Sequence, residues 1–337
     1  MSEERIRARS SHDHLAGIIP VAGGALDFGF EWPECMMPIG RDLVAIEKCL
    51  MELARAGCKT IWIICNDDIQ PLLKYRIGEW LKDPESIEKG KFISIRMAAK
   101  YERKIPIFYI PIKTLQHKTM NSFAWSVIYG ATVAHNISRN ITKWISPTRF
   151  YVSFPYGVYS SETIDFSSRN VMKNNKTVLL SYKGQTVEQG LYTGFIILYK
   201  DVVRIKKKLL NASRKTYSNN IIEVKNRSVV HEVFTIHRSA DKYVVKDVYT
   251  LDDVFQFEDE ENIVRIEIPW YYTIDSWETY CKYMESKEKR EMIRSEPILL
   301  PIESKRHHRD KTKWKYNPIR RKLNPIYRIN KNEDKSE

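Results

Sequence analysis

The chain has 337 residues, 43% of them hydrophobic and 12% aromatic, which suits the core of one large domain or two and excludes a disordered polymer. No run approaches the roughly 18 apolar residues of a transmembrane helix, so we predict no membrane span and no membrane partner. Residues 1–14 are polar and lack the apolar core of a secretion signal. We therefore expect a cytoplasmic protein.

The cysteines favour the same compartment. Five are present, an odd number, and no two stand at Cys-x-x-Cys spacing. This pattern predicts free thiols in a reducing environment, with neither a disulfide framework nor a zinc site.

The net charge of +13 is concentrated at the C-terminus. Residues 304–337 hold 12 Lys or Arg against 4 Asp or Glu, a net of +8, which leaves +5 for the other 303 residues. Few aliphatic residues and many charges predict an extended tail. We divide the chain into a flexible arm at 1–15, an α/β domain at 16–300 and a basic, partly extended tail at 301–337.

Residues 18–65 predict a strand–helix–strand unit. Ile18–Ala22 is a short apolar run typical of a buried strand, and Gly23 and Gly24 end it in a turn where a ligand can approach the backbone closely. Residues 42–56 carry apolar side chains at three- and four-residue spacing, as in an amphipathic helix. Thr60–Cys65 is a second buried run, which should pair with the first in parallel.

Further elements follow along the chain. Strands are predicted at Ile105–Ile112, Phe150–Phe154, Val178–Tyr182 and Leu191–Leu198, and helices after Asn121, at Val202–Ala212 and at Glu278–Met284; shorter elements are expected at Val229–Phe234, Tyr243–Val248 and Ile298–Pro301. Alternating strands and helices predict a mainly parallel sheet flanked by helices, with a ligand cleft at the carboxyl ends of its strands.

One stretch resembles a known signature. Pro33-Glu34-Cys35-Met36-Met37-Pro38-Ile39 is similar to the Pro-Lys-Pro-Leu-Leu-Pro-Ile that follows the glycines of the sugar-phosphate nucleotidyltransferases, the NDP-sugar pyrophosphorylases. The resemblance implies a GT-A-like, Rossmann-like fold. It also implies that the glycine loop wraps the phosphates of a nucleotide, so Ala22, Gly23 and Gly24 are candidates for nucleotide binding.

Two later segments extend the resemblance. Asn121-Ser122-Phe123-Ala124 is a loose echo of the family's base- and ribose-binding Gly-Thr-Ala-x-Ala, although Asn121 and Ser122 would serve equally well as helix caps. Gly190 begins a run similar to the family's Gly-x-Tyr after the sugar-binding loop. Glu188 and Gly190 are therefore sugar-binding candidates, and the alternative for Glu188 is a solvated loop carboxylate.

The catalytic positions depart from the family. Glu34 stands where the family has a lysine, and a carboxylate repels phosphates that an ammonium would attract. Tyr156 follows the strand whose family counterpart ends in the magnesium-binding aspartate. Residues 270–280 resemble the family's closing motif, with Thr273 at the second metal-binding aspartate. Asp275 is the nearest remaining candidate for a metal ligand.

Three functions stay open. The first is a catalytically degenerate nucleotidyltransferase-like protein, a binding or structural module that retains a nucleotide or sugar nucleotide. The second is an active enzyme that uses Mg²⁺ to form an NDP-sugar and pyrophosphate from a sugar 1-phosphate and an NTP. The third is a GT-A-type glycosyltransferase.

The tail suggests a separate partner. Basic and aromatic residues alternate in it, a pattern that favours nucleic acid or an acidic protein surface. The alternatives are a solubilising tail and a clamp that packs on the domain. The candidate nucleic-acid contacts are Lys313, Trp314, Lys315, Tyr316, Arg320, Arg321 and Lys322.

Overall fold

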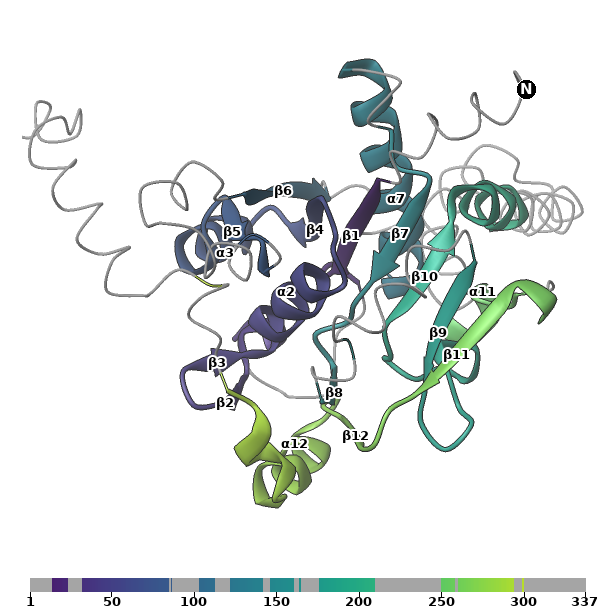
Figure 1. Ribbon diagram of the computed structural model, residues 1–337. Helices are drawn as coiled ribbons and strands as arrows, with labels where there is room; N and C mark the ends of the chain where they lie inside the picture. Colours follow the sequence, from purple (N-terminus) through teal and green to yellow (C-terminus); the bar gives the residue numbers. More distant parts are fainter. Residues whose placement is uncertain are drawn as a thin grey trace, which may run out of the picture. The chain divides into compact units, whose positions relative to one another are not determined.

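A mixed sheet of eight strands runs through the computed structural model (Figure 1). The structure describes residues 14–23, 32–84, 86, 103–112, 122–141, 146–160, 164, 176–209, 250–257, 260–293 and 299. These all belong to a unit formed by residues 1–299, and residues 300–337 form a second unit that lies outside the described residues.

The sheet order is β11-β9-β10-β7-β1-β4-β6-β5. Four neighbouring pairs are parallel: β11 with β9, β7 with β1, β1 with β4, and β4 with β6. Strand β10 is antiparallel to β9 and β7, and β5 is antiparallel to β6. The strands are β1 (Leu15–Pro20), β4 (Thr60–Asn66), β5 (Trp80–Lys82), β6 (Lys104–Ile112), β7 (Arg149–Val152), β9 (Thr177–Ser181), β10 (Phe195–Leu198) and β11 (Ile263–Glu267).

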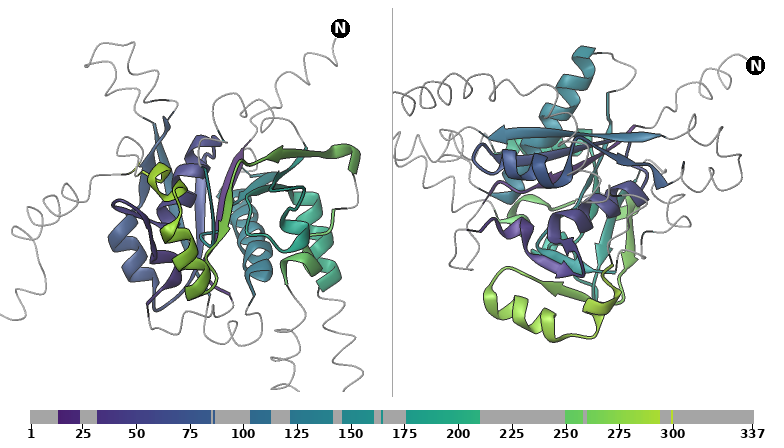
Figure 2. Two further views of the ribbon diagram at one scale, coloured as in Figure 1. Left: turned by 90° about the horizontal axis from the view of Figure 1, so that it is seen from below. Right: turned by 90° about the vertical axis from the view of Figure 1, so that its left-hand side faces the viewer.

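Helices cover both faces of this sheet (Figure 2). The described helices are α2 (Ala45–Arg55), α3 (Gln70–Ile77), α7 (Phe123–Ile141), α11 (Leu251–Val254), α12 (Trp277–Glu285) and a helix over residues 199–209, with 3-10 turns η1 (Glu34–Met36), η4 (Val187–Gln189), η5 (Glu260–Asn262) and η6 (Glu288–Glu291). Of these, α12 lies away from the large sheet, beside residues 271–273 (Figure 1). Two small sheets pair β2 (Pro38–Gly40) with β3 (Leu43–Val44), and β8 (Gly157–Tyr159) with β12 (Tyr271–Thr273). No described helix is long and apolar enough to cross a membrane.

Side-chain alternation along the strands creates two hydrophobic cores. In β1, Ile19 joins the core on the α2 face and Ile18 joins the core on the α7 face. A Cβ at Gly17 would come within 2.6 Å of Leu53 Cδ1, and one at Gly130 within 2.5 Å of Ile64 Cδ1. These two glycines therefore allow both helices to approach the sheet closely.

The predicted strand–helix–strand unit is confirmed. β1 and β4 are parallel, with Ile18 opposite Trp62. β1 begins at Leu15, three residues before the predicted start, because Leu15 also pairs with Arg149 of β7. α2 begins at Ala45 instead of residue 42, because Leu43 and Val44 form β3.

Two predicted strands need correction. Leu191–Leu198 is a strand only from Phe195, because the segment before it turns aside and the Leu191 N–H donates to the Thr186 carbonyl. Ile105–Ile112 is a strand, but it is only half buried: Phe108 is 41% exposed. The elements expected at 229–234 and 243–248 lie outside the described residues, as does almost all of 298–301.

A buried ion pair fixes α2 to the sheet. Lys48 Nζ lies 2.8 Å from Glu52 Oε2, and both side chains are fully buried. Glu52 also accepts hydrogen bonds from the hydroxyls of Tyr151 at 2.5 Å, Ser153 at 2.7 Å and Tyr159 at 2.6 Å. Four donors on one carboxylate compensate the desolvation of its charge.

Lys48, Glu52 and Tyr159 also contact the backbone at Gly157 and Gly194. Lys48 Nζ donates to the Gly157 carbonyl at 3.1 Å and lies 3.4 Å from the centre of the Tyr159 ring. The Gly194 N–H donates to the Tyr159 hydroxyl at 3.1 Å, and a Cβ at Gly194 would come within 2.5 Å of Glu52 Oε1. We call Lys48, Glu52, Tyr151, Ser153 and Tyr159 the buried hub.

Replacing one partner of the ion pair should destabilise the protein more than replacing both. Lys48→Met and Glu52→Leu each leave the opposite charge buried and unpaired, so each should lower the free energy of unfolding by about 3–5 kcal/mol. The double variant removes both charges and should be more stable than either single variant. Urea denaturation measures the free energy of unfolding of each variant. If the loss in the double variant equals the sum of the losses in the two single variants, the two side chains are not coupled.

Candidate functional site

The strand order contains one reversal that positions a site. After β1 the chain continues to β4 and β6 on one side, and then returns to β7 on the other side of β1. Ligands of open α/β sheets bind outside the carboxyl ends of the strands at such a switch point. The segments that leave these ends are 21–23 after β1 and 153–156 after β7, and the Ser153 N–H donates to the Ile18 carbonyl at 3.0 Å.

Gly23 meets the start of α7 at this edge. Its φ of +141° is one that glycine tolerates, and a Cβ there would lie 2.6 Å from the Phe123 nitrogen. The Ser126 hydroxyl donates to the Ala22 carbonyl. The glycine turn is thus packed directly against the first turn of the helix.

The structure brings together three of the five nucleotide-binding candidates: Ala22, Gly23 and Ser122. Ser122 Oγ accepts a hydrogen bond from the Trp125 N–H at 3.1 Å, so Ser122 caps α7. Gly24 and Asn121 lie outside the described residues.

Tyr156 and Thr273 lie on adjacent segments. β8 and β12 pair with Thr273 opposite Gly157, and the Ile274 N–H donates to the Tyr156 carbonyl at 2.8 Å. The resemblance assigns these two positions to the metal-binding aspartates of the nucleotidyltransferases. In this chain a phenol and an alcohol occupy these neighbouring positions.

Aromatic rings fill the space around Tyr156. Its side chain is 1% exposed, and its ring centre lies 4.7 Å from that of Phe123 and 5.7 Å from that of Tyr192. Tyr192 also lies 5.7 Å from Phe154. Burial raises the pKa of Tyr156 well above its usual value, so its hydroxyl stays neutral at physiological pH. We call Phe123, Phe154, Tyr156 and Tyr192 the aromatic cluster.

Carboxylates are the charged groups that we identify beside this cluster. Glu34 lies in η1, and Asp275 lies just after β12. Burial is the main cause of the raised pKa of Tyr156, and Cys35 and then the Glu34 charge raise it further. Burial is also the main cause of the raised pKa of Tyr192, and the Asp275 charge adds to it. Asp275 Oδ1 accepts a hydrogen bond from Thr279 Oγ1 at 3.1 Å. A phosphate entering here would meet negative charge.

The donor set does not fit Mg²⁺. This ion prefers several hard oxygen ligands in octahedral geometry, usually with one or two carboxylates, whereas Tyr156 offers a neutral, buried phenol and Thr273 an alcohol. Among the described residues, no group of three or more His, Cys, Asp and Glu side chains is arranged to hold a metal ion.

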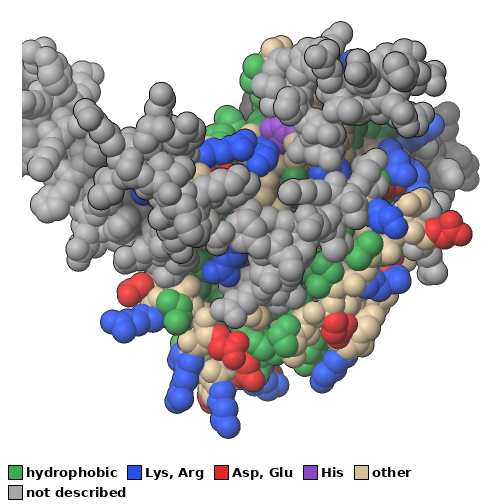
Figure 3. Space-filling view, viewed as in Figure 1, with side chains coloured by type: hydrophobic (Ala, Val, Ile, Leu, Met, Phe, Trp, Pro, Cys, Tyr) green, Lys and Arg blue, Asp and Glu red, His purple; other side chains and the backbone are tan. Residues whose placement is uncertain are grey.

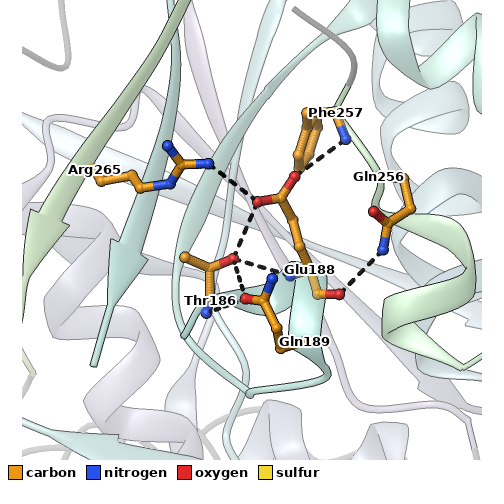
Figure 4. Close-up of polar contacts among 6 residues, drawn as sticks. All are labelled: Thr186, Glu188, Gln189, Gln256, Phe257 and Arg265. Carbon is orange, nitrogen blue, oxygen red and sulfur yellow. Dashed lines mark hydrogen bonds and ion pairs between the residues drawn. The ribbon is translucent and has the colours of Figure 1, made fainter. Parts of the chain in front are cut away.

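Glu188 is held by protein groups (Figure 4). Its carboxylate accepts from the Phe257 N–H at 3.3 Å and lies 3.6 Å from Arg265 Nη2, and its carbonyl accepts from Gln256 Nε2 at 3.1 Å. The side chain is only 11% exposed, so the prediction of a solvated loop carboxylate is wrong. These contacts fasten η4 to β11 and to the segment after α11.

Gly190 ends η4. Its φ is +85°, and a Cβ there would meet nothing within 4 Å. The backbone conformation therefore accounts for the glycine without a ligand close to it.

The sequence motifs did not identify the aromatic cluster. Its four members come from a helix start, a strand end and two loops, so no local spacing joins them. Aromatic residues at the ends of predicted strands were the available signal. The tail candidates between Lys313 and Lys322 lie outside the described residues.

No family model matches the chain, and no curated protein does. Among solved structures, the chain is similar to a UDP-glucose pyrophosphorylase complexed with UDP-glucose, at 13% identity and a TM-score of 0.42, over 80% of this chain and 97% of that chain. A UTP-bound UGPase from Acinetobacter baumannii is 12% identical, with a TM-score of 0.43, over 80% and 92%. A 4-diphosphocytidyl-2C-methyl-D-erythritol synthase from Anaerococcus prevotii is 12% identical, with a TM-score of 0.39, over 82% and 96%.

Two substitutions at Tyr156 should separate packing from metal binding. Tyr156→Phe keeps the ring and loses only a 3.5 Å contact with the Val21 carbonyl, so the free energy of unfolding should change by less than about 1 kcal/mol. Tyr156→Asp places a carboxylate among aromatic rings and should lower it by about 3 kcal/mol or more. Urea denaturation with and without Mg²⁺ measures both. An aspartate variant that is stable and gains further stability from Mg²⁺ would show that the position can still form a metal site.

Proposed function

We propose that this chain is a nucleotidyltransferase-like binding module that holds a nucleotide or sugar nucleotide without transferring it. The observation that carries the proposal is that Tyr156 and Thr273 lie on neighbouring segments, where Thr273 pairs with Gly157 and the Ile274 N–H donates to the Tyr156 carbonyl, and that the Tyr156 ring packs on Phe123. These positions adjoin one another as two metal-binding aspartates would have to, but they carry no carboxylate.

The loss of transfer chemistry follows from electrostatics. Phosphoryl and nucleotidyl transfer depend on metal ions and cationic side chains that neutralise charge developing in the transition state. Each such group contributes about 3 kcal/mol, by analogy with single oxyanion-hole donors. Glu34 places a negative charge where the resemblance implies a positive one. Tyr156 and Thr273 lack the carboxylates that would hold a metal ion at two further positions.

Groups suited to binding are retained. Gly23 and the first turn of α7 keep a close backbone-to-backbone contact at the switch point, and Tyr192 is the partly exposed member of the aromatic cluster. A nucleobase can stack on an aromatic ring whatever its identity. Binding through the base should not require Mg²⁺.

Purified protein should release no pyrophosphate from any of the four NTPs mixed with hexose 1-phosphates and Mg²⁺, because Tyr156 and Thr273 stand where the resemblance places the metal-binding aspartates. UTP and UDP-glucose should bind with the same affinity in Mg²⁺ and in EDTA, as measured by isothermal titration calorimetry. An authentic pyrophosphorylase serves as the positive control. Turnover, or binding that EDTA abolishes, would overturn the proposal.

A charge change at Glu34 tests the same site by binding alone. Glu34→Lys removes the repulsion of phosphates and should tighten UTP binding about tenfold. Glu79→Lys makes the same charge change at an exposed position before β5 and should leave it within twofold. Equal effects of the two variants would place the nucleotide elsewhere.

For the tail we propose a separate role as a nucleic-acid-binding element. The proposal is supported by its net charge of +8 over 34 residues and by Trp314, Tyr316 and Tyr327 among the cations.

Truncation after residue 303 should weaken binding of single- and double-stranded oligonucleotides and reduce its salt dependence, because fewer counterions are released. Fluorescence anisotropy at several salt concentrations measures both. Removal of only residues 329–337, which carry two Lys and three Asp or Glu, is the control and should have little effect. Unchanged affinity after the longer truncation would leave the tail with a solubilising or docking role.

A further inference from the structure

The helix over residues 199–209 presents a line of cations to solvent. Lys200, Arg204, Lys207 and Lys208 are all exposed, and their spacing of four, three and one residues puts them on one side of the helix. We call these four residues the basic stripe. Figure 3 shows Lys and Arg side chains at the right of the view, where this helix lies in Figure 1.

The opposite side of this helix packs into the hydrophobic core. Val202, Ile205 and Leu209 are buried in the core on the α7 face of the sheet. A helix that lies in a membrane surface needs a free apolar face, and this one has only Val203 exposed. The stripe is therefore better suited to a hydrophilic polyanion than to a lipid surface.

The stripe brings like charges close together. Lys200 with Arg204 and Arg204 with Lys208 are like-charged pairs at i, i+4, which destabilise a helix. Asp201 lies 3.2 Å from Arg204 and supplies one opposite charge. A polyanion bound along the stripe would interact favourably with these cations and release its own counterions.

A neighbouring helix extends the charged surface. The His135 ring of α7 stacks on Tyr199 with centres 3.6 Å apart, so the second half of α7 lies beside the start of the stripe. Arg139 is exposed one turn after His135 on the same side of α7. Arg139 therefore adds an exposed cation on the helix that contacts Tyr199, the residue before Lys200.

We propose that the basic stripe binds the phosphate backbone of nucleic acid. Lysine is a compact point charge that suits phosphate without demanding a fixed geometry, and three of the four stripe residues are lysines. The described surface offers no aromatic ring beside these lysines except Tyr199, which is already stacked on His135. Binding is therefore to the backbone and is independent of base sequence. This goes beyond the proposed nucleotide site and does not depend on it.

The test is a triple charge reversal in the full-length chain: Lys200→Glu, Lys207→Glu and Lys208→Glu. Fluorescence anisotropy with a labelled 20-nucleotide DNA strand and its duplex should show at least tenfold weaker binding at 50 mM salt. The slope of log K against log salt should fall by about 2 to 3, as expected when three phosphate contacts are lost. Circular dichroism should show an unchanged fold.

A matched control reverses three exposed cations elsewhere: Arg41→Glu, Lys287→Glu and Arg290→Glu, at β2–β3 and η6. It makes the same change in net charge and should alter affinity less than twofold. Both triple variants are also made in a chain that ends at residue 303, where the difference between them should persist. This comparison separates the contribution of the stripe to nucleic-acid affinity from that of the tail.

Three results would overturn the proposal. The first is wild-type affinity in the stripe variant, and the second is an equal loss in the control variant. The third is tighter binding of phosphatidylserine vesicles or poly-glutamate than of either oligonucleotide at the same salt concentration, since these probes represent a membrane and an acidic protein. Lys→Gln versions of the stripe variant should lose less affinity than the Lys→Glu versions, because they remove charge without reversing it.

Discussion

The fully buried Lys48–Glu52 ion pair is the interaction on which the rest of the structure depends. Neither charge could stay in the core alone, because the desolvation cost of one ion is several kcal/mol. Three hydroxyls from β7, the segment after it and β8 complete the coordination of the Glu52 carboxylate. The position of α2 on the sheet is therefore set by polar geometry as well as by apolar packing.

The buried hub also forms hydrogen bonds with the backbone segments that contain the candidate site residues. Lys48 bonds the carbonyl of Gly157, the residue next to Tyr156, and Tyr159 accepts from the N–H of Gly194, two residues after Tyr192. A Cβ at Gly157 would lie 2.0 Å from the Tyr192 carbonyl, so the two backbones are in direct contact. The hub and these glycines together fix the distance between the two site tyrosines.

The site at the switch point and the basic stripe differ in charge and in chemistry. At the first, a neutral aromatic cluster has Glu34 and Asp275 beside it, which favours stacking over phosphate binding. At the second, lysines on an exposed helix face favour phosphate and offer no ring of their own. The two proposals therefore concern different chemistry at separate places in the fold.

The sequence by itself determined the elements whose signals are local. Runs of apolar residues predicted β1, β4 and β9, and periodicity predicted α2. Local patterns suffice here because the spacing of apolar residues within a strand or helix indicates which of its faces is buried.

Tertiary structure decided what depends on contacts between distant segments. Glu52 accepts hydrogen bonds from hydroxyls about 100 residues away, and Phe123, Tyr156 and Tyr192 gather from distant segments, so neither arrangement produces a regular spacing in the sequence. Glu188 was predicted as a sugar ligand or a solvated carboxylate, and its contacts with Phe257 and Arg265, roughly 70 to 80 residues away, contradict the second of these predictions. Such residues cannot be assigned in advance, because the free energy of a buried charge is set by which donors the fold brings to it.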